Sequence, residues 1–166
     1  YGDELISLLK PFVYRRYLDY GAVQSLRKLK HMIESEVRRR SLNNNFKLGQ
    51  GGIREVEFIA QVFELMRGGR FEELRERSLR KTLKNIRALD LLPENICTLL
   101  DDCYVYLRRL ENVIQEFSDK QTQTLPDNAK DCARMLVAMN YQDKESFLHD
   151  LDEVMSAVHE EFKLVV

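Results

Sequence analysis

Apolar residues recur every three or four positions along almost the whole chain, and this spacing is typical of amphipathic helices. The clearest example is the stripe Ile96, Leu100, Cys103, Leu107, Leu110, Ile114 and Phe117. No segment alternates apolar and polar residues for long enough to indicate a strand. We therefore predict an all-α fold. The short connections favour an antiparallel bundle, with about six or seven helices.

The same spacing, together with helix-ending residues, predicts where the helices lie. They are expected over 3–18, 22–40, 53–67, a segment capped by Ser78, a long segment led by Pro93, and 128–139 and 144–165. Residues 41–52 and 121–127 are predicted to be connections because they are polar or rich in Gly. Pro11 should break or kink the first helix, since proline has no N–H to donate.

Composition limits the class of protein. The chain has 166 residues, of which 44% are hydrophobic and 32% are charged, so we expect one folded domain over residues 1–166. The three cysteines have no metal-site spacing, and Cys97 and Cys103 lie in a helical pattern that indicates small core residues. No run is apolar enough to cross a bilayer and no signal peptide is recognisable, so we expect a cytoplasmic setting with no membrane partner.

Charge is distributed unevenly. Residues 1–70 carry a net charge of +5 and residues 71–166 carry −6, whereas the whole chain has −1. The overall charge predicts no nucleic-acid partner. The basic first half favours an anionic ligand or an acidic partner surface near it. Equally, the two halves could neutralise each other within one fold.

The segment FKLGQGGIREVEF, residues 46–58, is the strongest functional signal. Gly49, Gly51 and Gly52, three of only 7 glycines, precede an apolar helix that should begin at Ile53. The first turn of a helix has unpaired N–H groups and a partial positive charge, and glycines allow an anion to approach them. Because Lys47 and Arg54 flank this point, the segment predicts a phosphate contact. The alternative is a tight turn that packs the helix against a neighbour.

A row of polar side chains follows on the same helix, at Arg54, Glu57, Gln61 and Glu64. Such a row on an apolar helix indicates water, a cleft or charged partners. We expect Arg54 and Glu57 to face a cleft and Glu64 to lie at a solvated edge. A weak ion pair between Arg54 and Glu57 is the alternative.

Other polar residues give weaker signals. We interpret His31, His149 and His159 as ordinary surface residues, and Arg108, Arg109 and Glu111 as salt links between neighbouring helices. A basic surface without interleaved aromatic residues is more typical of a solvated helix face than of a strand-binding platform. Its members are Arg15, Arg16, Arg27, Lys28, Lys30, His31, Arg38, Arg39 and Arg40.

Groups for catalysis are not recognisable. The chain has no Asp-x-Asp pair on a strand to hold magnesium, no nucleophile motif and no zinc spacing. We therefore predict no catalytic and no metal-binding residue here, and interpret the chain as a supporting or substrate-binding module.

Several motifs together resemble the family of the glutamine synthetase adenylyltransferase/adenylyl-removing enzyme. They occur in the family's order: LLKPFVYRRYLDY, AVQSLRKLK, EVRRR, KLGQGGIREVEFIAQ, FELMRGGR, YLRRLEN and QTQTLP. The GGIREVEF and QTQTLP forms resemble the amino-terminal half, which removes AMP. The carboxy-terminal half carries a different version of the glycine loop.

The resemblance implies a helical domain that follows a nucleotidyltransferase catalytic domain absent from this chain. It implies Mg²⁺ and ATP, ADP or phosphate as cofactors of the longer enzyme, with Mg²⁺ held by aspartates of the catalytic domain. Its partners would be glutamine synthetase, the PII signal protein and the upstream catalytic domain. In the helical domain, Lys47, Gly49, Gly51, Gly52, Arg54 and Glu57 would line the cleft and contact phosphate or nucleotide, with Glu57 orienting Arg54. This segment alone would be inactive.

Two alternatives stay open. One is the similar helical module of a PII uridylyltransferase-like enzyme, although QTQTLP and YLRRLEN favour the adenylyl-removing enzyme. The other is a non-catalytic module that binds glutamine synthetase or PII through its helix faces. Titration with nucleotide or phosphate, and separately with glutamine synthetase, tests the second alternative, because binding of the protein alone would favour an interaction module.

Overall fold

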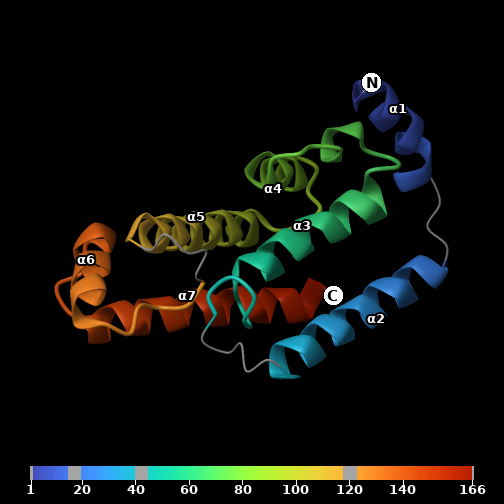
Figure 1. Ribbon diagram of the computed structural model, residues 1–166. Coiled ribbons are helices and arrows are strands. Elements are labelled where there is room, and N and C mark those ends of the chain that lie inside the picture. Colours follow the sequence, from blue (N-terminus) through green and yellow to red (C-terminus); the bar gives the residue numbers. More distant parts are fainter. Residues whose placement is uncertain (1, 15–19, 40–44, 118–122, 166) are drawn as a thin grey trace.

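The computed structural model describes residues 2–14, 20–39, 45–117 and 123–165. These residues form seven α-helices and one short 3-10 helix (Figure 1). The elements are α1 (Gly2–Val13), α2 (Tyr20–Arg39), α3 (Ile53–Arg67), η2 (Glu72–Leu74), α4 (Leu79–Ala88), α5 (Glu94–Phe117), α6 (Ala129–Met139) and α7 (Lys144–Val165). In this described part no strand forms, and Asn45 and Thr124 make an isolated β-bridge. The all-α prediction is confirmed.

Helix ends lie where the sequence provides caps. The backbone N–H of Gly68 donates to the carbonyl of Glu64 and closes α3. Asn128 Oδ1 accepts a hydrogen bond of 2.8 Å from the N–H of Asp131 and starts α6. Asn140, with φ of 69°, takes the left-handed conformation that ends this helix. Ser78 is the residue before α4, as predicted, but its side chain makes no capping hydrogen bond.

The first helix differs from its prediction. Pro11 lies inside α1, which continues to Val13 instead of breaking. Proline removes one backbone donor, and here it does so close to the carboxyl end, where the N–H of Tyr14 still donates to the carbonyl of Lys10 at 2.9 Å. Residues 15–18 of the predicted helix lie outside the described residues.

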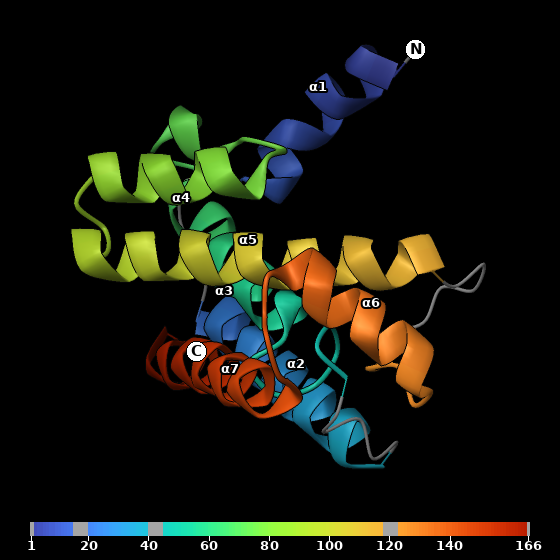
Figure 2. The same ribbon diagram turned by 90° about the vertical axis from the view of Figure 1, so that its left-hand side faces the viewer.

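Two apolar clusters form the core, and both include α5 and α7. The first joins α3, α4, α5 and the end of α7, around Ile59, Ile86 and Phe162. The second joins the start of α3 to α5, α6 and the beginning of α7, around Ile53, Leu107 and Phe147. Figure 2 shows α4 beside α5, with α6 crossing the other end of α5. The glycine segment therefore lies where α3, α5 and α7 meet.

Cys97 and Cys103 behave as small core residues, as predicted. Cys97 and Cys103 are free and buried in the first cluster, and Cys132 is free and partly buried. Burial raises the pKa of the Cys103 thiol to about 11, so this side chain stays protonated at neutral pH.

The predicted stripe of α2 can be followed only in part. Leu29 is 40% exposed, whereas the side chains of Ala22, Leu26, Ile33 and Val37 lie outside the described part. Among the predicted basic surface, Lys28, His31 and Arg39 are exposed and Lys30 is half-buried, with its Nζ 5.1 Å from the centre of the Phe162 ring. The side chains of Arg15, Arg16, Arg27, Arg38 and Arg40 are likewise not described.

The first helix carries an exposed apolar row. The exposed fractions of Leu5, Leu8 and Leu9 are 58%, 78% and 46%, and α1 lies apart from α6 and α7 in both views (Figures 1 and 2). Within the described ranges, no helix has the combination of length and apolarity needed to cross a bilayer. That residues 1–166 form a single domain stays a prediction.

Candidate functional site

Residues 45–52 form a turn built around a buried asparagine. Asn45 Oδ1 accepts hydrogen bonds from the N–H groups of Lys47 and Leu48, at 3.0 and 2.8 Å. Its backbone carbonyl accepts another from the N–H of Gly49, at 2.7 Å. Asparagine favours such local bonds because its short side chain mimics the backbone of a turn. The turn is therefore defined by its own hydrogen bonds before it meets α3.

The turn also occupies the start of α3. The N–H groups of Ile53 and Arg54 donate to the carbonyls of Phe46 and Lys47, at 3.2 and 3.1 Å. The N–H of Glu55 donates to the carbonyl of Gly52 at 3.0 Å. These are the donors that a bound anion at a helix start normally uses. In this structure backbone carbonyls of the chain hold them.

At two positions of the turn another part of the backbone lies so close that only glycine, which has no Cβ, fits. Gly51 has φ of +71°, and a Cβ added there would overlap the carbonyl group of Met155 in α7. A Cβ on Gly52 would lie 2.7 Å from the carbonyl oxygen of Lys47. Gly49 is buried in the same turn. The glycines thus have a structural role that matches the tight-turn alternative, and their contact with phosphate stays a prediction.

A buried glutamate joins this turn to α7. Glu55 is 7% exposed, and its Oε2 accepts a hydrogen bond of 2.9 Å from the N–H of Gly51. The same carboxylate oxygen lies 3.0 Å from Nδ1 of His159 on α7. The interpretation of His159 as an ordinary surface residue was wrong, because its ring is largely buried against Glu55 and Phe162. The pair tethers α7 to the turn.

A second polar network links the turn to α3 and α5. Lys47 Nζ lies 2.9 Å from Glu111 Oε1, and Arg108 donates to Glu111 Oε2 at 2.6 Å. Arg108 also donates to Glu57 Oε1 at 2.5 Å and to the hydroxyl of Tyr104 at 3.1 Å. We call Lys47, Glu57, Tyr104, Arg108 and Glu111 the α3–α5 network. It confirms the predicted link between neighbouring helices for Arg108, which pairs with Glu57 of α3. Glu111 pairs instead within α5 and with the turn, and Arg109 donates to the backbone carbonyl of Ala138.

Burial alone would raise the pKa of Glu111, whose side chain is 4% exposed. Hydrogen bonds and charge from Lys47 and Arg108 outweigh burial and hold the pKa below its usual value. Glu111 is therefore a carboxylate at neutral pH, neutralised by two cations.

Glu64 behaves differently. It is half-buried and accepts a hydrogen bond of 2.9 Å from Thr82, which is fully buried. Burial raises the pKa of Glu64 despite this bond. The predicted solvated edge was wrong for Glu64, because α4 packs against this part of α3.

The six predicted site residues thus separate into three groups. The glycines form the turn, Lys47 and Glu57 belong to the α3–α5 network, and Arg54 is exposed on the first turn of α3. The expected pair between Arg54 and Glu57 does not form, since Glu57 points to Arg108 instead. Within the described residues, the side chain of Arg54 makes no hydrogen bond or ion pair. Its guanidinium is available to an external anion.

The described part of the chain offers a poor fit for Mg²⁺. Among the described residues, the one group of three potential ligands within 4.8 Å of one another is His149, Asp150 and Glu153, and all three are exposed. Mg²⁺ prefers oxygen ligands, and one of these three side chains is an imidazole. Asp150 also accepts a hydrogen bond from the Tyr141 hydroxyl. This group of described residues is therefore poorly suited to Mg²⁺.

The acid stability of the chain should depend on Glu111. The pKa of Glu111 in the folded state is below its value in the unfolded state. Its ionised form therefore stabilises the fold fully above about pH 4.3, the pKa of an unperturbed glutamate side chain. That stabilisation is lost as the pH falls through the lower folded pKa. Urea denaturation at a series of pH values should therefore show a smaller acid loss for Glu111→Gln than for the wild type. The exposed Glu116→Gln is the control, and equal acid profiles for the two variants would contradict the assignment.

Comparison with known proteins identifies the family. A family model described as GlnD PII-uridylyltransferase matches residues 27–166. A bifunctional glutamine synthetase adenylyltransferase/adenylyl-removing enzyme from Psychromonas ingrahamii is 51% identical over 166 residues, which are 100% of this chain and 18% of that protein. A protein of the same name from Vibrio parahaemolyticus is 50% identical over 164 residues, 99% of this chain and 17% of that protein.

The chain thus spans less than a fifth of the length of these two curated relatives. The family model covers most of this chain, and both relatives align along nearly all of it. The chain therefore belongs to the family described as GlnD PII-uridylyltransferase, and it is similar over its whole length to one segment of bifunctional glutamine synthetase adenylyltransferase/adenylyl-removing enzymes.

Proposed function

We propose that the chain is the helical substrate- and nucleotide-binding domain of an enzyme that adenylylates and deadenylylates glutamine synthetase. The observation that carries this proposal is the 51% identity over all 166 residues to a relative of that name. We assign the chain to the half that removes AMP by phosphorolysis, because the GGIREVEF and QTQTLP segments resemble that half. The longer protein would act in the cytoplasm and regulate nitrogen assimilation.

In this proposal the catalytic domain lies upstream and packs against the helical domain. Each half of the longer enzyme would have its own catalytic domain, with Mg²⁺ held by aspartates there. ATP or phosphate would be the reactant, and ADP would be the product of AMP removal. The exposed leucines of α1 support a domain contact, since a row of exposed apolar residues on one helix is typical of an interaction surface. Glutamine synthetase would be the protein substrate, and PII would bind as the regulator.

The glycine turn would contribute to the reaction through side chains. Inorganic phosphate attacks the phosphorus of the AMP group on a tyrosine, and negative charge accumulates as the bond to the tyrosine oxygen breaks. The donors at the start of α3 are held by carbonyls, so Arg54 is the group of this segment best suited to stabilise that charge. The α3–α5 network would keep the first turn of α3 rigid.

The variant Arg54→Ala tests this role. In a full-length enzyme that carries this segment, removal of AMP should slow by about 10² or more, because a donor to transition-state charge is lost. Phosphorolysis of adenylylated glutamine synthetase is measured as ADP release, and addition of AMP is measured on the same preparation. Since Arg54 belongs to the removing half, the rate of addition should change much less.

Arg77→Ala is the matched control, because Arg77 is an exposed arginine just before α4. Its variant should retain both rates. An unchanged removal rate in Arg54→Ala, with the melting temperature intact, would mean that the turn has an architectural role only. Loss of addition with removal retained would assign the segment to the other half.

The name of the family model favours a second candidate, a PII uridylyltransferase-like enzyme. The two candidates differ in protein substrate, which is PII in one case and glutamine synthetase in the other. Incubation of the full-length enzyme with each protein and radiolabelled UTP or ATP distinguishes them. We expect label from ATP on glutamine synthetase, and label from UTP on PII would support the second candidate.

A further inference from the structure

The helix α4 is unusually basic for its length. Its 10 residues contain Arg80, Lys81, Lys84 and Arg87 and no acidic residue. Arg80 and Lys81 lie in its first turn, where the helix dipole disfavours cations, and Lys84 has a cation three or four residues away on each side. Both features weaken an isolated helix. The arrangement therefore requires negative charge from outside α4, and Asp101, Glu76 and Glu94 supply part of it.

Neighbouring carboxylates neutralise only part of this charge. Arg80 makes two hydrogen bonds to Asp101 of α5, at 2.7 and 2.8 Å. Arg87 lies 3.3 Å from Glu94, but both side chains are at least half exposed, so the pair is weak. Lys84 makes no ion pair or hydrogen bond through its side chain within the described residues. Lys84 is thus available to a ligand, and Arg87, one turn away, is held only by its weak pair with Glu94.

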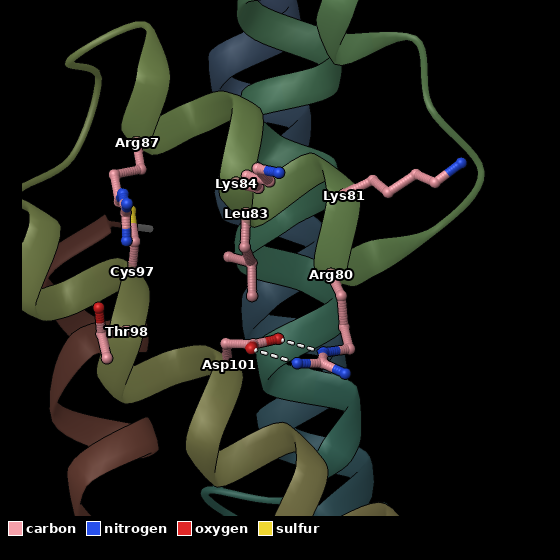
Figure 3. A pocket seen from close by; sticks show the side chains of 8 residues that line it. All are labelled: Arg80, Lys81, Leu83, Lys84, Arg87, Cys97, Thr98 and Asp101. Carbon is pink, nitrogen blue, oxygen red and sulfur yellow. Dashed lines mark hydrogen bonds and ion pairs between the residues drawn. The ribbon is translucent and has the colours of Figure 1, made fainter.

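These cations border a hollow between α4 and α5. It has a volume of about 400 Å³, within the range of small-molecule sites, and Leu83 and Cys97 form part of its lining. Figure 3 shows Leu83 at its middle, Arg87 beside Cys97 on one side and the Arg80–Asp101 pair on the other, whereas Lys81 points away. The aliphatic parts of the basic side chains add to the apolar lining of the hollow, and their charged ends lie above this lining.

We propose that the hollow between α4 and α5 binds a small organic phosphate, with the phosphate at Lys84 and Arg87 and the apolar part of the ligand against Leu83 and the aliphatic stems. Arginine suits this role because its planar guanidinium bonds two phosphate oxygens at once, and lysine adds a mobile charge. The site shares no residue with the glycine turn or the α3–α5 network. Binding here can therefore be tested separately from the role proposed for Arg54.

Three probe molecules separate the contribution of the phosphate group from that of the apolar part of the ligand. Phenyl phosphate carries an anion and an apolar body, inorganic phosphate carries the anion alone, and phenol carries the body alone. Each is titrated at constant ionic strength into the ¹⁵N-labelled 166-residue chain, and amide shifts are followed by NMR. We expect saturable shifts with phenyl phosphate at Leu83 to Arg87 and Cys97 to Asp101, with a Kd of about 1 mM or below. Inorganic phosphate should bind at least about threefold more weakly, and phenol should not saturate.

Charge reversal at Lys84 gives the decisive comparison. Lys84→Glu should weaken phenyl phosphate by about tenfold or more, because a charge-assisted contact becomes a repulsion. Lys130→Glu, at an exposed lysine of α6, is the matched control and should leave the affinity unchanged. The proposal is overturned if phenyl phosphate gives no saturable shifts in the hollow, if inorganic phosphate binds as tightly, or if the two charge reversals have the same effect. Arg87→Gln should reproduce the loss without reversing a charge.

Discussion

Gly51→Ala is expected to destabilise the fold by about 2–5 kcal/mol, the largest effect of any single methyl group added to the described turn. A left-handed backbone angle costs a residue with a Cβ about 1–2 kcal/mol. The new methyl group would also overlap the carbonyl group of Met155, and such overpacking typically costs about 1–3 kcal/mol. Because domains of this size are stable by about 5–15 kcal/mol, the loss is a large part of the total.

Urea denaturation followed by circular dichroism measures this effect, and the melting temperature should fall by roughly 5–15 °C. Gly2→Ala is the matched control, because a Cβ there would meet nothing within 4 Å. It should leave the stability nearly unchanged. A loss below about 0.5 kcal/mol for Gly51→Ala would show that α7 does not approach the turn this closely.

Arg108→Met should produce the second largest loss, about 2–3 kcal/mol. Removing one member of a buried ion pair costs about 3–5 kcal/mol, because the remaining charge is left without its partner. Here Glu111 is 4% exposed, but Arg108 and Glu57 are each about one-third exposed, so water compensates in part. Methionine retains much of the apolar volume, which isolates the loss of charge and hydrogen bonds.

A double-mutant cycle with Glu111→Gln separates this pair from general packing. The coupling free energy between positions 108 and 111 should be about 0.5–3 kcal/mol. Arg80→Met is the control, since it removes an arginine that also makes two bonds to a carboxylate but is 60% exposed, and it should cost less than about 1 kcal/mol. Equal losses for the two arginine variants would mean that the α3–α5 network contributes no more than a surface pair.

The helices were predictable because their signals are local. The predicted ranges 53–67 and 144–165 agree with α3 and α7, since apolar spacing and an ending glycine act within a few residues. The break predicted at Pro11 does not occur, because α1 continues to Val13 although Pro11 supplies no N–H for one helical hydrogen bond. Whether the helix is kinked there stays a prediction.

The candidate site was less predictable because its contacts are not local. His159 is 104 positions from Glu55, and Arg108 is 51 positions from Glu57, so no spacing rule pairs them. The polar row on α3 did indicate that Glu57 needs a partner, but it could not say that the partner comes from α5. One signal was present: a glutamate three residues after the glycine turn is typical of a side chain that reaches back to a turn N–H.

The glycine cluster shows how one pattern permits two physical explanations. Glycines before a helix allow an anion to approach, and they equally allow another backbone to approach. At Gly51 and Gly52 the structure has the second, with Met155 and Lys47 as the approaching groups. The first explanation survives only for side chains around the turn, where Arg54 is a cation without a side-chain partner among the described residues.

Hydrogen exchange at the amides of Gly51, Ile53 and Arg54 tests most directly whether the turn closes the start of α3. These amides donate to Glu55, Phe46 and Lys47, so they should exchange as slowly as the core amides of α5. Added inorganic phosphate should leave their exchange unchanged. Exchange near the rate of an unfolded peptide, slowed strongly by phosphate, would show instead that the helix start is open and binds the anion through its backbone.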